Sequence, residues 1–106
     1  MDQQNRRRAL LIAKNLLESR INAIEAARAL LPFLRADPTL AMPEDRKVLA
    51  GIDSETDDLP VGQVREEWHP DLLLERDKEI ERYEKIYRDQ VRAICQRIVQ
   101  NGALRS

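Results

Sequence analysis

The sequence predicts an all-α fold, and three observations carry this prediction. Leu, Ala, Ile, Glu and Arg dominate a chain with only three glycines, which is a composition typical of helical proteins. Apolar residues recur every three or four positions in both halves of the chain. No stretch alternates apolar and polar residues as a half-exposed strand does. We therefore expect one domain, residues 1–106, that forms a small helical bundle of two long amphipathic helical regions, with short helices in a central loop.

The first helical region begins at Arg6, after a polar segment, residues 1–5, that we expect to fray. Its apolar residues fall on one helical face as far as Leu34. One long helix or two helices fit this pattern, and we favour a break near residues 18–22 with Ser19 as the N-cap of the second helix. Pro32 is expected to end or kink that helix, because proline lacks a backbone N–H and crowds the preceding turn.

The central loop follows, from residue 35 to residue 69. Pro43 suits the first position of a short helix, which we expect to stop near Gly51. Residues 51–69 contain two of the three glycines, the only Trp, the only His, and six carboxylates against one Arg. Pro60 and Gly62 predict a turn, and residues 64–68 are long enough for one helical turn. A connection of this length in a small domain is usually functional or ordered by packing.

The last helical region, residues 72–100, has the clearest pattern in the chain. It opens at Pro70, and Leu73, Ile80, Tyr87 and Ile94 recur every seven residues. Asn-Gly at residues 101–102 predicts a helix stop, which would leave residues 102–106 as a frayed tail.

Composition argues against several classes of partner. The formal net charge is −1, whereas nucleic-acid-binding proteins usually carry a basic surplus or a basic face, so a nucleic-acid partner is not expected. Residues 6–8, the only basic run, adjoin a helical pair that could act as a helix–turn–helix, which keeps DNA association as an alternative. The second helix of that pair is mostly apolar, which disfavours it. No apolar run reaches about 18 residues, so no membrane span is predicted.

The single cysteine and the single histidine exclude further chemistry. Cys95 cannot form an internal disulfide, and the default location of such a chain is a reducing cytoplasm. Its neighbours Ile94 and Ile98 are apolar, so we expect a buried and inert thiol. His69 cannot build a conventional zinc site with Cys95. We therefore expect no cofactor, assign no metal site and name no catalytic residue.

Alternating carboxylates mark the candidate site. Asp53, Glu55 and Asp57 have the spacing of a calcium loop, but Asp58 replaces the required glycine and Val64 the required bidentate glutamate. A looser metal or ligand site, or an enzyme that uses these acids with His69, remains an alternative. Capping of nearby backbone N–H groups would employ one or two of the acids rather than four. The surplus favours a binding surface for a basic partner protein.

Two further side chains affect the interpretation of this surface. Trp68 is expected either in the core or, beside the acids, as a contact residue with an exposed edge. Arg28 or Arg65 could be the internal partner of Asp53 or Asp57, which would make part of the acidic tract structural. The predicted partner-binding residues are Asp53, Glu55, Asp57, Asp58 and Trp68.

The segment GIDSETDDLPVGQVREEW, residues 51–68, follows an Ile-Glu-Ala-Ala-Arg helix and precedes a long charged helix. In these features the chain resembles a group of small bacterial helical proteins, to which no activity is attached. Small acidic bacterial domains of this type include toxin-neutralising immunity proteins. We expect an interaction or regulatory protein, with an immunity-like role among the options. The amphipathic faces also favour a helical homodimer.

Overall fold

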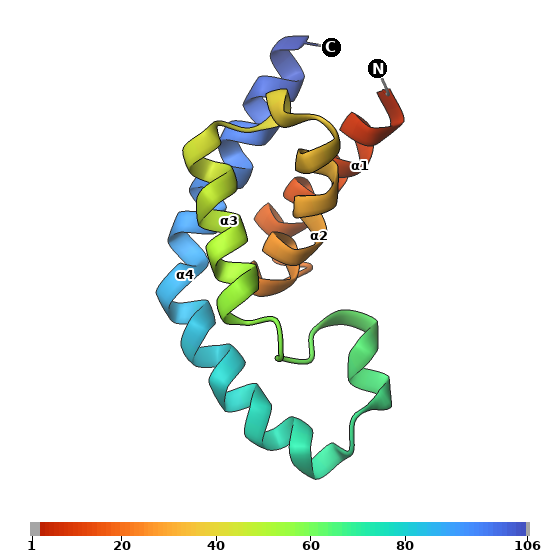
Figure 1. Ribbon diagram of the computed structural model, residues 1–106, viewed down its shortest axis with the longest axis vertical. Coiled ribbons are helices and arrows are strands. Elements are labelled where there is room, and N and C mark those ends of the chain that lie inside the picture. Colours follow the sequence, from red (N-terminus) through yellow and green to blue (C-terminus); the bar gives the residue numbers. More distant parts are fainter. Residues whose placement is uncertain (1–2, 106) are drawn as a thin grey trace.

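A computed structural model describes residues 3–105, with side chains described as far as Asn101. Four helices, α1 (Gln3–Leu17), α2 (Ala23–Ala36), α3 (Pro43–Glu55) and α4 (Pro70–Arg105), are joined by loops that contain the 3₁₀ helices η1 (Pro38–Leu40) and η2 (Gly62–Glu67). No strand occurs in this part of the chain, so the predicted all-α fold is confirmed. The first three helices pack beside the C-terminal part of α4, whereas its N-terminal part extends beyond them (Figure 1).

The predicted break in the first helical region is confirmed, but its capping differs from the prediction. Ser19 does not cap the second helix; it follows the first one in the left-handed region, with φ at 61°. The N–H of Arg20 donates to the carbonyl of Asn15 at 2.8 Å, and that of Ser19 donates to the carbonyl of Leu16 at 3.0 Å. These two bonds form a Schellman motif, which ends α1 by satisfying carbonyls that lack a helical partner.

The N-cap of α2 is Asn22, three residues after the expected position. Its Oδ1 accepts a hydrogen bond from the N–H of Glu25 at 2.8 Å. The remaining free N–H groups in this turn, those of Ala23 and Ile24, donate to the carboxylate of Glu84 on α4, the second at 3.2 Å. A carboxylate there also complements the positive end of the helix dipole. Glu84 therefore fastens the start of α2 to the middle of α4.

Helix α2 forms the centre of the bundle. Its buried residues include alanines that allow the neighbouring helices to approach closely, and leucines that fill the space between them. A second, smaller cluster joins the loop after α3 to α2 and α4. It consists of Ile24, Leu59, Val61 and Ile80, with Tyr83 packed against it. This cluster holds the central loop against the helices that support the candidate site.

An ion pair between a buried aspartate and an exposed arginine joins α3 to α4. Asp45 lies in the first turn of α3, and its carboxylate accepts from Nε and Nη2 of Arg97, both at 2.8 Å. This bidentate geometry satisfies an acid that is otherwise nearly enclosed. The pairing also raises the pKa of Arg97.

Several helix boundaries differ from those expected. Helix α1 begins at Gln3 rather than Arg6, and α2 continues four residues beyond Pro32. Helix α3 passes through Gly51 and ends at Glu55, because the buried Ile52 anchors its last turn in the core. Helix α4 continues through residues 101–102 as far as Arg105. The fraying expected for residues 1, 2 and 106 lies outside the described residues.

Across residues 3–105, no helix is both long enough and apolar enough to cross a membrane.

Candidate functional site: an acidic end of the molecule

Charge is distributed unevenly along the molecule, which measures 45 × 24 × 23 Å. Residues 53–81 carry eleven Asp and Glu against three Lys and Arg, whereas the rest of the chain carries eight against fifteen. In space, residues 53–81 comprise the last turn of α3, the loop with η2, and the first part of α4, which together form one end of the molecule (Figure 1). We call this region the acidic end. The net charge of −1 thus averages over two oppositely charged regions.

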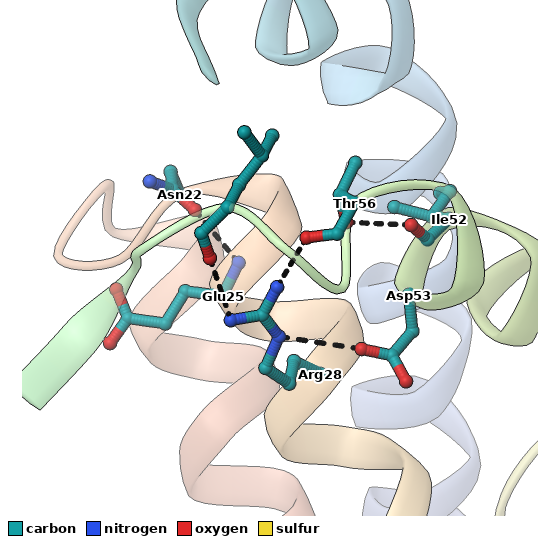
Figure 2. A network of polar contacts seen from close by, with 7 residues as sticks. Asn22, Glu25, Arg28, Ile52, Asp53 and Thr56 are labelled. Atoms are coloured by element: carbon teal, nitrogen blue, oxygen red, sulfur yellow. Dashed lines mark hydrogen bonds and ion pairs between the residues drawn. The ribbon is translucent and has the colours of Figure 1, made fainter. Parts of the chain in front are cut away.

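Arg28 of α2 holds the first part of the loop in place. Its Nη2 donates to the carbonyl of Thr56 at 2.6 Å, its Nη1 to the carbonyl of Leu59 at 3.1 Å, and its Nε to Oδ1 of Asp53 at 3.4 Å (Figure 2). The buried Thr56 hydroxyl donates in turn to the carbonyl of Ile52 at 2.7 Å. We call this set of contacts the Arg28 clamp. It fixes the backbone where the chain leaves α3.

Arg65 of η2 holds the second part of the loop. Its two terminal nitrogens bind the carboxylate of Asp77 on α4 at 2.6 and 3.1 Å, and Nη1 also donates to the carbonyl of Pro60 at 3.1 Å. These hydrogen bonds lower the pKa of Asp77 and raise that of Arg65. Gly62 begins η2 with φ at +70°, and a Cβ there would meet the carboxylate of Glu25 at 3.4 Å. Glycine suits this position because its φ lies in the left-handed region, whereas a Cβ would meet Glu25 at ordinary van der Waals distance.

The four predicted site acids divide into two pairs. Asp53 and Glu55 lie in the last turn of α3 rather than in a loop, which corrects the expected helix end. Asp53 is half-buried in the Arg28 clamp, and Glu55 accepts a hydrogen bond from the hydroxyl of Tyr87, which raises the pKa of that tyrosine. Asp57 and Asp58 are exposed and have no hydrogen-bond or ion-pair partner among the described residues. Only this second pair is free to contact another molecule without breaking an internal bond.

Trp68 and His69 lie where η2 gives way to α4. Trp68 is half-buried, so its ring neither fills the core nor stands free. Its backbone N–H donates to the carbonyl of Arg65 at 3.1 Å. His69 is exposed, and its Nδ1 accepts from the backbone N–H of Asp71 at 3.2 Å. This bond caps the start of α4.

Three further acids belong with the free pair and were missed by the sequence reasoning. Glu66, Glu67 and Glu75 are exposed and have no hydrogen-bond or ion-pair partner among the described residues. The first two directly follow Arg65, whose side chain binds Asp77 instead. The signal in the sequence was the density of acids on both sides of Trp68. The five free acids of the acidic end are Asp57, Asp58, Glu66, Glu67 and Glu75.

The other chemistries considered find no matching geometry in the described part of the chain. No three His, Cys, Asp or Glu side chains there gather as a metal site requires. Cys95 is buried, and burial raises the pKa of its thiol to about 12, so the thiolate that would act as nucleophile is scarce near neutral pH. Seven of the fourteen residues of α2, the second helix of the helix–turn–helix alternative, are buried in the bundle, which leaves less of its surface for the base contacts of a recognition helix.

Comparison with known proteins assigns no family to this chain. No protein-family model, no curated protein and no solved structure matches it significantly. Small helical bundles host many unrelated functions, so the fold alone does not select one. The chemistry of the acidic end is the remaining indicator of function.

Proposed function

We propose that this protein is a small interaction protein that binds a basic surface of a partner protein through its acidic end. A regulatory role, or an immunity-like one in which the partner is neutralised, fits this mode of binding. The observation that carries the proposal is the set of five free acids on a scaffold whose neighbouring acids are already bonded. Five of the six other carboxylates of the acidic end contact Arg28, Tyr87, Arg65, Arg76 or Lys85, and Asp71 lies 3.8 Å from Nδ1 of His69, whereas the five free acids have no such contact among the described residues.

The negative charge of these acids favours the binding of a cationic partner. Like charges at one end of a small domain repel each other, and a cationic partner would relieve that repulsion. Complementary potentials also accelerate association and disfavour partners of the wrong charge. The acidic end carries a formal charge of −8, from eleven acids and three bases, which is far larger than the charge of the whole chain. The binding that we propose is therefore fast and weakened by salt.

The loop of the acidic end is also held in an ordered conformation before any partner binds. The Arg28 clamp and the Arg65–Asp77 pair tie the loop backbone to α2 and α4. A loop that is already ordered loses less conformational entropy on binding than a flexible one does. The internal ion pairs of the acidic end therefore support a binding role rather than compete with it.

Apolar side chains beside the free acids favour a protein partner over a small cation. Val64 is 46% exposed and Leu72 is 50% exposed, and the half-buried Trp68 lies between them in the chain. Protein interfaces typically combine a few aromatic or aliphatic contacts with a charged rim. The acidic end offers both within one short stretch of chain.

Affinity capture with charge-neutralised variants tests the proposal. The test variant is Asp57→Asn/Asp58→Asn/Glu66→Gln/Glu67→Gln, which removes charge with little change of shape. The control, Glu18→Gln/Asp89→Asn, neutralises exposed acids on the rest of the molecule. Circular dichroism first establishes that all three proteins are folded.

The proposal predicts one basic protein that the wild type and the control retain and that the test variant loses. The retained protein must then bind again as a purified component, and less tightly as salt is added. Retention that is equal for the test variant and the control, or a partner without a basic surface, would refute the proposal.

A further inference from the structure

A second surface lies away from the acidic end, between the C-terminal half of α2 and the start of α3. It is a hollow of about 300 Å³ with an apolar floor and basic side chains around it. Such a hollow can accept apolar side chains from another molecule, provided that the accompanying charges are negative. The lining residues are Leu31, Leu34, Pro43 and Ala50 on the apolar side and Arg35, Arg46 and Lys47 on the basic side.

The three basic residues of the hollow have no carboxylate partner among the described residues. None of Arg35, Arg46 and Lys47 forms an ion pair, and Nε of Arg46 is buried without a hydrogen-bond acceptor. Elsewhere in the molecule Arg28, Arg65 and Arg97 are each paired with an aspartate. The cations of the hollow are thus available to an acidic ligand.

The chain itself carries a surface that complements this hollow. At the start of α4, Leu72 is 50% exposed and Leu74 is 67% exposed, which makes Leu74 one of the most exposed apolar side chains described. Asp71 lies three residues before Leu74, on the same side of the helix, and Glu75 follows it directly. Exposed leucine with flanking carboxylates is what an apolar floor with a cationic rim would bind.

The hollow and the start of α4 lie toward opposite ends of the molecule (Figure 1), so one chain cannot bring them together. We propose that the hollow binds the acidic end of a second copy of this chain, with Leu74 on the apolar floor and carboxylates of α4 against Arg35, Arg46 and Lys47. This inference rests on the proposed role of the acidic end as an interaction surface. It adds that a second copy occupies that surface when the basic partner is absent.

The contact is head-to-tail and therefore differs from a symmetric pairing of helix faces. Two copies joined in this way leave one hollow and one acidic end unoccupied. Association can then continue to longer chains or close into a ring. A basic partner that covers the acidic end would release the copies from one another.

Sedimentation velocity on the purified full-length protein tests this inference, with two variants that each remove one surface. Arg35→Glu/Lys47→Glu reverses the charge at the hollow, and Leu74→Lys disrupts the start of α4. Leu11→Lys is the control, because Leu11 is 59% exposed on α1 and belongs to neither surface. All four positions are solvent-exposed, so the variants should fold, and circular dichroism establishes this before the measurement.

The wild type and the control should associate as concentration rises to about 1 mM, and added salt should weaken this association. Each surface variant alone should associate about tenfold more weakly or remain monomeric. An equimolar mixture of the two variants should form dimers and nothing larger, because only one functional interface remains in the mixture. A wild type that stays monomeric, a mixture without dimers, or a surface variant that dimerises as well as the wild type would each overturn the inference.

Failure here is distinguishable from failure of the proposed function. The two surface variants retain the carboxylates of Asp57, Asp58, Glu66 and Glu67, which the test variant of the capture experiment replaces by amides. A monomeric wild type that still captures a basic partner refutes self-association alone. Head-to-tail dimers without any captured basic partner refute the proposed function alone.

Discussion

Replacing Arg28 by Met tests whether the clamp determines the stability of the acidic end. The substitution keeps an apolar stem and removes the hydrogen bonds to the carbonyls of Thr56 and Leu59 and to Asp53. The Arg28 side chain is 29% exposed, so each bond to a carbonyl is worth about 1.5 kcal/mol, the lower end of the range for charge-assisted bonds. The partly exposed contact with Asp53 adds a few tenths of a kcal/mol at most. We expect the free energy of unfolding to fall by about 3 kcal/mol.

Urea unfolding followed by circular dichroism measures this change, and Arg35→Met is the matched control. Arg35 lies on the same helix, is exposed and has no ion pair among the described residues, so its substitution should change stability by less than about 0.5 kcal/mol. Arg28→Lys should recover only part of the loss, because a single ammonium group cannot reproduce the geometry of a guanidinium with several acceptors. Equal and small losses for Arg28→Met and Arg35→Met would refute the role assigned to the clamp.

Three further predictions follow from individual residues. Ser19→Gly should raise the free energy of unfolding by about 0.5–1 kcal/mol in urea titrations, because glycine adopts the left-handed conformation at this helix end without steric cost. An unchanged free energy of unfolding would contradict the Schellman motif assigned to the end of α1. Arg65 lowers the pKa of Asp77 in the folded state. The ion pair therefore stabilises the protein at pH values above the ordinary pKa of a carboxyl group, and this stabilisation is lost as the pH falls through the lowered pKa of Asp77. The free energy of unfolding of the wild type should therefore exceed that of Asp77→Asn by less than about 1 kcal/mol near neutral pH, since the pair is exposed, and the difference should vanish at acidic pH. A difference that grows at acidic pH would contradict the pairing of Asp77 with Arg65. Cys95 should react with a thiol-specific reagent only when the protein unfolds, because burial raises the pKa of its thiol to about 12, and rapid labelling of the native protein would show that the site is open.

The fold class and the helix break were predictable from the sequence because both depend on local patterns. Apolar spacing defines the buried faces whatever the tertiary arrangement is. The predictions that helices stop at Gly51 and at residues 101–102 were wrong because the helix ends depend on tertiary packing as well as on local signals. Stop signals are weak local preferences, and packing of a neighbour such as Ile52 extends the helix beyond them. The N-cap prediction at Ser19 was wrong because Ser19 adopts the left-handed conformation that ends α1, and this moves the cap to Asn22.

The candidate site was predictable only in part. Its acidic character is visible in the sequence, and so is Arg28 as one possible partner of Asp53. The sequence could not choose between Arg28 and Arg65, because the choice depends on contacts between residues 25 positions apart. Arg65 binds Asp77, an acid that no sequence pattern had singled out.

The separation of charge into two regions also required the structure. A helix that runs the length of the molecule brings its own acids beside those of the loop (Figure 1). Net charge and composition contain no information about that arrangement. The unpaired cations beside the hollow of α2 and α3 became apparent for the same reason, since they come from two helices that pack together only in the folded chain.

The most direct test of the central claim is the affinity of the captured basic partner, measured with purified proteins at low and at high salt. The wild type is compared with Asp57→Asn/Asp58→Asn/Glu66→Gln/Glu67→Gln and with the control Glu18→Gln/Asp89→Asn. We predict that the four neutralisations at the acidic end weaken binding about tenfold or more and reduce its dependence on salt, while the control binds as the wild type does. Equal affinity and equal salt dependence for all three proteins would contradict the claim that the free acids form the binding surface.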